Sequence, residues 1–293
     1  MSKVLAPIRK FTENYVDDIA CHSESWVDHV SHLRQFLEVI RQSGFTLSLK
    51  KCNWAQPSVK FLGSIIGSGQ RRADPDKVET VKNLRIPENK KQVRQILGFL
   101  GHFQEYIPEF AKLAKPLTDL TGKRYSHRIP WGHLEQSAFE ELKSRLIKAT
   151  IEPIGTIDCK KPFLIMVDSC DYAVGGILTQ TDENNSYRPV AFASSKLSET
   201  QRRWATIEKE CYALIWSLKK FKPWIFCVPT VVQTDHNPLT YLTNTAPKNS
   251  KLMRWLLAIQ EFNNVRFEFR AGKSNVAADC VSRMVYRDDQ RGD

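Results

Sequence analysis

The chain has 293 residues, of which 42% are hydrophobic and 26% are charged. This composition is typical of globular proteins with a buried core, and the length suits two or three compact units. The formal net charge of +11 favours a polyanionic partner, although a basic surface can also serve solubility alone.

The cysteines and the apolar runs exclude several classes of protein. The seven cysteines are scattered without a Cys-x-x-Cys pair, which argues against a disulfide framework and against a zinc ribbon. No apolar run approaches the roughly 20 residues that cross a bilayer, and the N-terminus lacks a signal-peptide pattern. We therefore expect free thiols in a reducing compartment, an intracellular protein and no membrane partner.

Residues 1–70 combine short strands with one helix. Asp17 and Asp18 stand between apolar strand residues, as in a hairpin turn. The pattern over 28–43 predicts a helix, and Lys60–Ile66 predicts one short strand. The apolar residues of the expected helix are Val30, Leu33, Leu37 and Ile40.

Residues 74–150 are expected to be helical almost throughout. Asp74-Pro75 is a helix start signal, because Asp caps a first turn and Pro suits the first helical position. Further prolines divide this part into several helices, and the polar stretch 153–162 predicts a linker. The apolar stripes are more typical of a core than of a cofactor site; they comprise Val93, Ile96, Leu97, Leu100, Phe103, Phe139, Leu142, Leu146 and Ile147.

Residues 163–284 alternate strands and helices. Phe163–Val167 is apolar, too short for a helix and followed by a polar turn, which predicts a buried strand. Asp168 ends this strand and Asp235 ends a later one, so neighbouring parallel strands could present both acids at one edge of a sheet. The other expected elements are a strand ending at Gln180, strands over 188–195 and 265–270, and helices over 199–221 and 274–284.

A carboxylate at the end of a buried strand costs free energy unless another group pairs with it. An acid of the 199–221 helix, Asp235, and Asp279 in the last helix could join Asp168. Four converging carboxylates would repel one another and raise their pKa values, and a pair of divalent cations removes that penalty. The cluster therefore indicates a two-metal site that cleaves phosphodiesters.

Each acid, taken alone, has a plain structural alternative. Asp commonly begins a turn or caps a helix, and Asp279 could simply be a favourable charge at a helix N-terminus. Helical periodicity also does not distinguish Glu208 from Glu210, because they flank opposite margins of the buried face. The four acids together, in this order of elements, favour the metal site.

A family resemblance connects these elements. Val167–Gln180 resembles the opening of the ribonuclease H domain of gypsy-type long-terminal-repeat retrotransposons. It has Asp-Ser-Cys where the family usually has Asp-Ala-Ser, which leaves the carboxylate unchanged. The resemblance continues in Arg188–Ser195, Glu208–Leu214, Thr234–Tyr241 and Gly272–Arg283. It selects Glu210 over Glu208, and the metal-binding acids that it implies are Asp168, Glu210, Asp235 and Asp279.

The resemblance extends upstream. Tyr15–Asp18 is similar to the reverse transcriptase catalytic turn, and Lys60–Gly63 resembles the strand that positions the primer end. The segments that resemble the thumb are Asp74–Val78, Val93–Leu100, Ala114–Leu117 and Ala138–Leu142. The resemblance thus implies an α+β palm remnant (1–70), a helical thumb or connector (71–152), a linker (153–162), an α/β ribonuclease H-like domain with a five-stranded mixed sheet (163–284) and a tail (285–293).

The implied activity is endonucleolytic hydrolysis of the RNA strand in an RNA–DNA hybrid. One Mg²⁺ would activate the attacking water and the other would stabilise the leaving 3′ oxygen; Mn²⁺ suits the same oxygen ligands. Basic thumb residues would hold the hybrid or a template-primer by its phosphates, in the cytoplasm, a virus-like particle or the nucleus. Self-association is left open. The candidate nucleic-acid contacts are Lys60, Gly63, Arg71, Arg72, Asn237 and Asn275, with Ser194 and Ser195 as further groups near the site.

Polymerisation is not expected of this chain alone. It needs a further upstream carboxylate and fingers that hold the nucleotide, and only 14 residues precede Tyr15. Asp17 and Asp18 are then the remnant of a polymerase site. Two alternatives to an autonomous nuclease stay open: a non-catalytic, domesticated or decaying nucleic-acid-binding protein, and a fragment that is active only when joined to its missing fingers.

Overall fold

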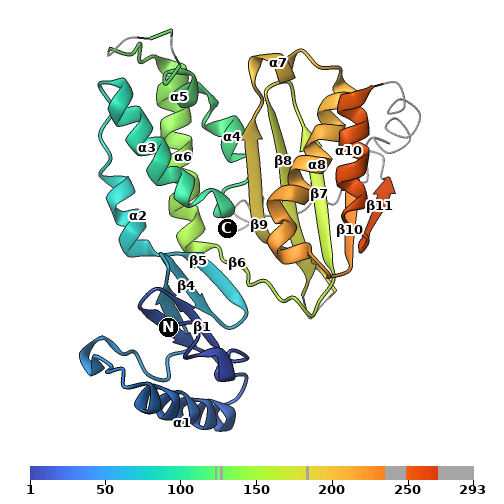
Figure 1. The fold of residues 1–293 in the computed structure, drawn as a ribbon. Coiled ribbons are helices and arrows are strands. Elements are labelled where there is room, and N and C mark those ends of the chain that lie inside the picture. The colour runs from blue at the N-terminus through green and yellow to red at the C-terminus, as the bar shows by residue number, and fades with distance from the viewer. Residues whose placement is uncertain (123, 126–127, 183–184, 235–248, 270–293) are drawn as a thin grey trace, which may run out of the picture. The chain divides into compact units, whose positions relative to one another are not determined.

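The computed structural model describes residues 1–122, 124–125, 128–182, 185–234 and 249–269 (Figure 1). The chain divides into two compact units, Met1–Ser68 and Gly69–Asp293, and each has a hydrophobic core of its own. None of the helices in these described stretches is long and apolar enough to span a membrane.

The first unit contains the hairpin expected around the adjacent acids. β1 (Thr12–Tyr15) pairs antiparallel with β2 (Asp18–Cys21), so that Val16 and Asp17 form a two-residue turn. Val16 has a φ of 52°, in the left-handed region that such turns use. Asp17 and Asp18 are both exposed. The unit also has two short 3-10 helices, η1 (Ala6–Ile8) and η2 (Leu49–Lys51).

The long helix of this unit is α1 (Trp26–Ser43). It begins two residues earlier than the apolar pattern predicts, because the Ser25 hydroxyl caps it by accepting a hydrogen bond from the Asp28 backbone N–H at 3.1 Å. The predicted stripe is partly wrong, since Leu37 is 43% exposed and Phe36 is buried beside it. The buried face of α1 therefore includes Phe36 in place of Leu37, the residue that follows it.

The single strand expected over Lys60–Ile66 is wrong. The structure has two strands here, β3 (Val59–Phe61) and β4 (Ser64–Gly67), paired antiparallel. Leu62 and Gly63 form the turn, with φ values of 51° and 78°. Two consecutive positive φ angles suit a two-residue hairpin, and Leu at the first position hides this turn from the sequence.

The second unit begins with a layer of helices. β5 (Gln70–Ala73) pairs antiparallel with β6 (Ile154–Gly155), so a strand lies within the stretch expected to be a linker. α2 (Pro75–Lys82) begins as predicted, with the Asp74 side chain accepting a hydrogen bond from the Asp76 backbone N–H at 3.1 Å. The helices that follow are α3 (Lys90–His102), η3 (Gln104–Tyr106), α4 (Phe110–Leu113), α5 (Lys115–Asp119) and α6 (His133–Ile151).

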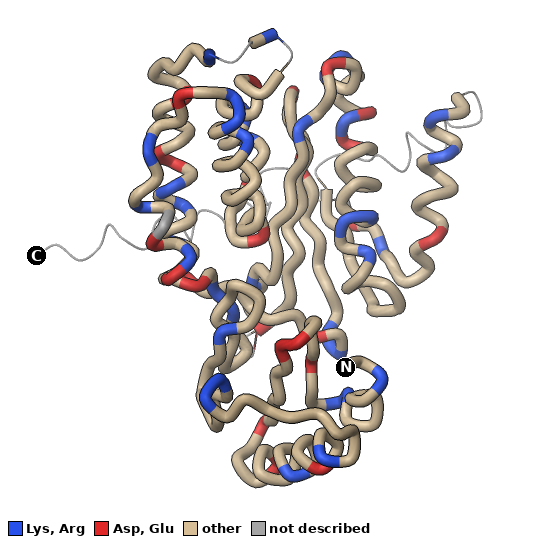
Figure 2. Tube along the Cα trace, turned by 60° about the vertical axis from the view of Figure 1, so that its left-hand side comes forward, with Lys and Arg blue, Asp and Glu red and all other residues tan. Residues whose placement is uncertain are grey.

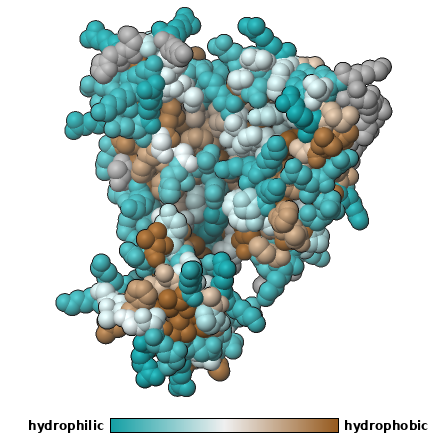
Figure 3. All heavy atoms as spheres, viewed as in Figure 1, coloured by the Kyte–Doolittle hydropathy of each residue, from teal (hydrophilic) through white to brown (hydrophobic). Residues whose placement is uncertain are grey.

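The apolar stripes predicted for these helices meet in one core. Val93 and Leu100 of α3 are buried together with Phe139, Leu142 and Leu146 of α6. On the face shown in Figure 3, the sides of α2 and α3 that face the viewer are mostly hydrophilic. This division is typical of amphipathic helices, whose packing fixes the layer as a unit.

The five-stranded mixed sheet predicted for the C-terminal domain is confirmed. Its order is β11-β10-β7-β8-β9 (Figure 1). β10 runs parallel to both β7 and β11, whereas β8 pairs antiparallel with β7 and with β9. The strands are β7 (Phe163–Ser169), β8 (Ala173–Thr181), β9 (Tyr187–Lys196), β10 (Thr230–Thr234) and β11 (Val265–Phe269).

Two helices, α8 (Thr206–Ile225) and α10 (Ser250–Gln260), cover one face of this sheet (Figure 1). The uninterrupted helix predicted to begin at Glu199 is wrong at its start. α7 (Glu199–Arg202) ends after one turn, and Ala205 has an extended backbone with a ψ of 151°. An extended residue breaks the helical hydrogen-bond ladder, so α8 starts anew at Thr206.

The two faces of the sheet belong to different cores. Ile165 and Val167 of β7 pack against Leu214 of α8 on one face. Phe192 of β9 belongs instead to the core of the helical layer. The helical layer and the sheet of the second unit therefore share side chains along β9.

Candidate active site

Asp168 lies at the end of β7, where the strand leaves the core. Val167 is buried in the core that β7 shares with α8, and Asp168, the next residue along the strand, is the first that leaves this core. Asp168 is exposed, and its partner across the ladder is Gly175 of β8. Both residues line a cavity of about 280 Å³. The carboxylate is therefore placed where a ligand from solution can meet it.

Glu210 approaches the same strand end from α8. It is only 3% exposed, and its Oε1 accepts a hydrogen bond from the Ser169 hydroxyl at 2.6 Å. Ser169 follows Asp168 as the last residue of β7. Glu210 is therefore bound to the residue adjacent to Asp168. Ser169 was not singled out from the sequence, and a hydroxyl beside a strand-ending Asp was the only signal for it.

Glu208 has a different environment. It accepts a hydrogen bond from Lys251 of α10 at 2.7 Å. The ammonium of Lys251 lies 4.2 Å from the ring centre of Trp204 and 5.1 Å from that of Trp255. The two acids that periodicity does not separate thus differ in structure: Glu208 joins α8 to α10, and Glu210 joins α8 to the end of β7.

The remaining acids of the predicted site, Asp235 and Asp279, lie outside the described residues, as do Asn237 and Asn275. The strand that precedes Asp235 is described, and β10 is the parallel neighbour of β7, with Gln233 paired to Met166. This confirms the parallel arrangement predicted for the two strands. Over the described ranges, no group of three or more His, Cys, Asp and Glu side chains could hold a metal ion; these ranges contain two of the four expected acids.

A second wall of the cavity comes from the helical layer, whose apolar stripes predict a core alone. Pro108, Glu109 and Lys112, at the start of α4, line the cavity together with Asp168. Glu109 has a φ of 51°, an uncommon backbone state for a residue with a side chain. Apolar periodicity does not predict this wall, because α4 has four residues and is too short to show a helical pattern.

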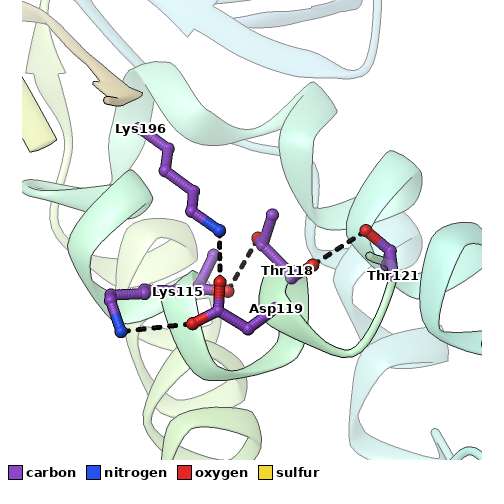
Figure 4. Close-up of polar contacts among 6 residues, drawn as sticks. Lys115, Thr118, Asp119, Thr121 and Lys196 are labelled. Carbon is purple, nitrogen blue, oxygen red and sulfur yellow. Dashed lines mark hydrogen bonds and ion pairs between the residues drawn. The ribbon is translucent and has the colours of Figure 1, made fainter. Parts of the chain in front are cut away.

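Hydrogen bonds fix α4 and α5 to β9. The Ser194 hydroxyl, expected near the site, accepts a hydrogen bond from the Ala111 backbone N–H at 2.8 Å. Asp119 of α5 receives hydrogen bonds from Lys115 at 3.1 Å and from Lys196 of β9 (Figure 4). Burial tends to raise the pKa of Asp119, but the hydrogen bonds from Lys196 and Lys115 lower it below its ordinary value. Ser195, the neighbour of Ser194, pairs with Val174 in the sheet.

The other nucleic-acid candidates lie in unlike surroundings. Arg71 is committed to the protein: its guanidinium pairs with Glu105 at 2.9 Å and donates to the Val190 carbonyl at 2.7 Å. Arg72 is exposed. In the first unit, Lys60 is exposed on β3 and Gly63 lies in the following turn. Figure 2 shows basic and acidic residues interspersed along the helices rather than separated by sign.

Comparison with known families agrees with this arrangement. Residues 158–262 match the model of an RNase H-like domain found in reverse transcriptase, and this range includes four of the five strands of the sheet (β7 to β10), α8 and α10. Residues 1–66 match the model of reverse transcriptase (RNA-dependent DNA polymerase). The two matches fall in the two units of the structure.

Similar curated proteins are transposon polyproteins. The chain is 35% identical over 281 residues to a retrovirus-related Pol polyprotein from transposon opus of Drosophila melanogaster, covering 92% of this chain and 28% of that protein. It is 32% identical over 275 residues to the transposon Tf2-3 polyprotein of Schizosaccharomyces pombe, covering 92% of this chain and 20% of that protein. The chain thus spans between a fifth and a third of the length of these relatives.

Similar solved structures support the fold. The foamy viral protease-reverse transcriptase in complex with RNA/DNA hybrid matches with a TM-score of 0.80 at 21% identity, over 92% of this chain and 37% of that chain. A second structure of that viral protein, dRH in complex with ds DNA, matches with a TM-score of 0.79 at 22% identity, over 92% and 47%.

Proposed function

Because the chain belongs to the reverse transcriptase and ribonuclease H region of retrotransposon Pol polyproteins, we propose that its second unit hydrolyses the RNA strand of RNA–DNA hybrids. The observation that carries this proposal is the hydrogen bond of the buried Glu210 to Ser169, the residue that follows the exposed Asp168 at the end of β7. A buried carboxylate is costly for a fold to keep, and such groups concentrate at functional sites.

The donor set at this strand end fits a hard divalent cation. Asp168 and Glu210 supply carboxylate oxygens and Ser169 supplies a hydroxyl, and oxygen donors suit Mg²⁺ or Mn²⁺. We assign Asp235 and Asp279 as the acids that complete the ligand set. Two such cations, when bound, supply the positive charge that activates the attacking water and stabilises the leaving oxygen.

The side chains around the acids have separate roles in this proposal. Ser169 donates to Glu210 at 2.6 Å and so restricts the rotamer of that carboxylate. Asp168 faces the cavity, where the phosphodiester of the RNA strand enters. Contacts to 2′-hydroxyl groups would distinguish RNA from DNA, and the remaining affinity for hybrid or template-primer would come from phosphates.

Hydrolysis, and not polymerisation, is the activity that we assign to this chain. Within the described residues, the second unit holds the buried Glu210 bound to the residue that follows the exposed Asp168, whereas Asp17 and Asp18 of the first unit are both exposed. Primer extension by the purified chain on a template-primer would contradict this assignment.

The test is cleavage of a hybrid whose RNA strand is labelled, by the purified chain with Mg²⁺ and beside an Asp168→Asn variant. We expect the wild type to cut the RNA strand, the variant not to cut it, and chelation of Mg²⁺ to stop the reaction. Binding of the hybrid without any metal-dependent cleavage would overturn the proposal. That outcome would favour a non-catalytic nucleic-acid-binding protein.

A further inference from the structure

The cavity lined by Asp168 is also lined by a basic residue. Lys112 of α4 lines the cavity from the helical layer, and Asp168 lines it from the sheet. We propose that Lys112 binds a backbone phosphate of the nucleic-acid strand that enters this cavity. It would then be a substrate-positioning residue supplied by the thumb or connector and not by the ribonuclease H-like domain. That the bound strand belongs to an RNA–DNA hybrid rests on the proposed function. The contact between Lys112 and a phosphate does not depend on that function.

Charge is the first argument for this contact. A phosphodiester that approaches the ionised Asp168 meets repulsion, which a cation in the lining of the same cavity reduces. The hydrogen bond and charge of Glu109 raise the pKa of Lys112 above its ordinary value, so the ammonium stays protonated at neutral pH. The side chain is 46% exposed and a four-carbon stem carries its charge, so the ammonium is accessible from solution.

The present partner of Lys112 does not prevent the contact. Lys112 pairs with Glu109 at 3.1 Å, three residues before it, and the Glu109 side chain is 55% exposed. Exposed pairs of this kind contribute about 0–1 kcal/mol, so the ammonium can exchange a carboxylate for a phosphate. Phosphate contacts also release condensed counterions, which adds to the driving force.

The position of Lys112 relative to the sheet is fixed by its neighbours. Ala111, the preceding residue, donates its backbone N–H to Ser194 of β9 at 2.8 Å. Asp119 of α5 binds Lys196 at the end of the same strand. The strand next to β9 is β8, whose Gly175 faces Asp168 in the ladder. α4 is therefore held at a constant place beside the cavity.

The alternative is that Lys112 is an ordinary surface lysine paired along its own helix. The chain offers a matched control for this alternative in Lys82 of α2. Lys82 pairs with Glu79 at 2.7 Å with the same spacing and similar exposure, and it is not among the residues that line the Asp168 cavity. Lys112→Met and Lys82→Met remove the same charge at the two places.

The experiment is fluorescence anisotropy of a labelled RNA–DNA hybrid with the full chain, without divalent metal, over a range of salt concentrations. We expect Lys112→Met to raise the Kd about tenfold at low salt, the loss of one charge-assisted contact. The slope of log Kd against log salt should fall by about 0.9, as for one lost phosphate. Lys112→Arg should restore most of the affinity, and Lys82→Met should leave both quantities close to the wild type.

Equal losses in Lys112→Met and Lys82→Met would overturn the proposal, since they would reflect net charge alone. An unchanged Kd in Lys112→Met, with the thermal midpoint of the wild type, would also overturn it. With Mg²⁺, the proposal predicts a higher KM of cleavage at an unchanged kcat. If the wild type binds hybrid but does not cleave it, the proposed function fails while the binding comparison still decides the role of Lys112.

Discussion

The acids of the β1–β2 hairpin and the acids at the end of β7 have different surroundings. In the hairpin of β1 and β2, Asp17 lies in the two-residue turn and Asp18 is the first residue after it. Both side chains are exposed. At the end of β7, Asp168 is exposed, but the neighbouring Ser169 holds Glu210, which is 3% exposed, at 2.6 Å. Neither acid of the hairpin is buried, whereas at the end of β7 one acid is exposed and the other is buried and bound to the strand.

The difference shows what a carboxylate site needs besides carboxylates. A turn fixes the backbone of its residues and leaves their side chains to solvent, where an added charge is screened. A sheet edge under a helix brings acids from distant parts of the chain together and partly excludes water, which strengthens their interactions with a cation. Glu210 is therefore held more firmly at the end of β7 than Asp17 and Asp18 are in their hairpin, although the latter are adjacent in sequence.

The largest effect that we expect is a difference in cleavage rate between a variant at the end of β7 and a variant in the β1–β2 hairpin. Glu210→Gln should lower the rate of hybrid cleavage on the order of 10²–10³-fold, because it removes a charge held beside the reacting phosphate. Asp18→Asn should leave the rate within about twofold, because Asp18 is not one of the acids assigned to the metal site. Single-turnover cleavage measures both, and Glu208→Gln is a control on the same helix. A large loss in Asp18→Asn with an unchanged hybrid Kd would break the comparison.

A second prediction concerns the close approach of α8 to the sheet. A Cβ on Gly176 would lie 2.6 Å from the Ser217 Oγ and 3.0 Å from the Ser217 Cβ. Gly176→Ala should therefore push α8 away from β8 and cost about 1–3 kcal/mol of unfolding free energy. On the neighbouring Gly175, a Cβ would meet nothing nearer than the Ala193 carbonyl oxygen at 3.6 Å.

Urea unfolding of the two alanine variants measures this contrast. Gly175→Ala should change the unfolding free energy by less than about 0.5 kcal/mol, as surface substitutions usually do. Equal destabilisation by both variants would show that the helix does not depend on the absent side chain at Gly176. Glu210 would then owe its place to other contacts of α8.

A smaller effect is expected at the junction of α8 and α10. Lys251 pairs with Glu208 at 2.7 Å and lies over the rings of Trp204 and Trp255. Lys251→Met should cost about 1 kcal/mol through the lost cation–π and ion-pair contacts. Arg254→Met, an exposed residue of the same helix, is the control and should cost less than about 0.5 kcal/mol. A thermal midpoint unchanged by Lys251→Met would contradict this.

The sequence was informative where a local pattern determines the structure. Apolar runs and alternation predicted the strands of the sheet, and Asp74-Pro75 predicted the start of α2, because caps and periodicity depend on a few adjacent residues. Local patterns failed at Leu62-Gly63 and at Arg203–Ala205, where backbone torsions and not residue type interrupt the element.

Long-range packing was beyond the reach of the sequence. Periodicity placed Glu208 and Glu210 at the two margins of one helix face, and only the partners on β7 and α10 separate them. Arg71 looked like a surface cation in the sequence, yet it binds a carbonyl of β9 at 2.7 Å across 119 positions of the chain. Lys112 joins the cavity for the same reason, since α4 packs on a strand that follows it by about 80 residues.

The smallest expected effect tests how α5 is held to β9. The folded pKa of Asp119 is lowered by Lys196 and Lys115, so its contribution to stability is present above the unfolded pKa of about 3.9 and is lost as the pH falls through the folded value. Its side chain is 45% exposed, so we expect Asp119→Asn to cost less than about 1 kcal/mol at pH 7. Urea unfolding at pH 7 and in acid should show this cost shrinking below about pH 4, since the wild-type acid is then itself neutral. A cost that stays constant over this range would mean that Asp119 acts through packing and not through its charge, and the two lysines would then not be what holds α5 beside β9.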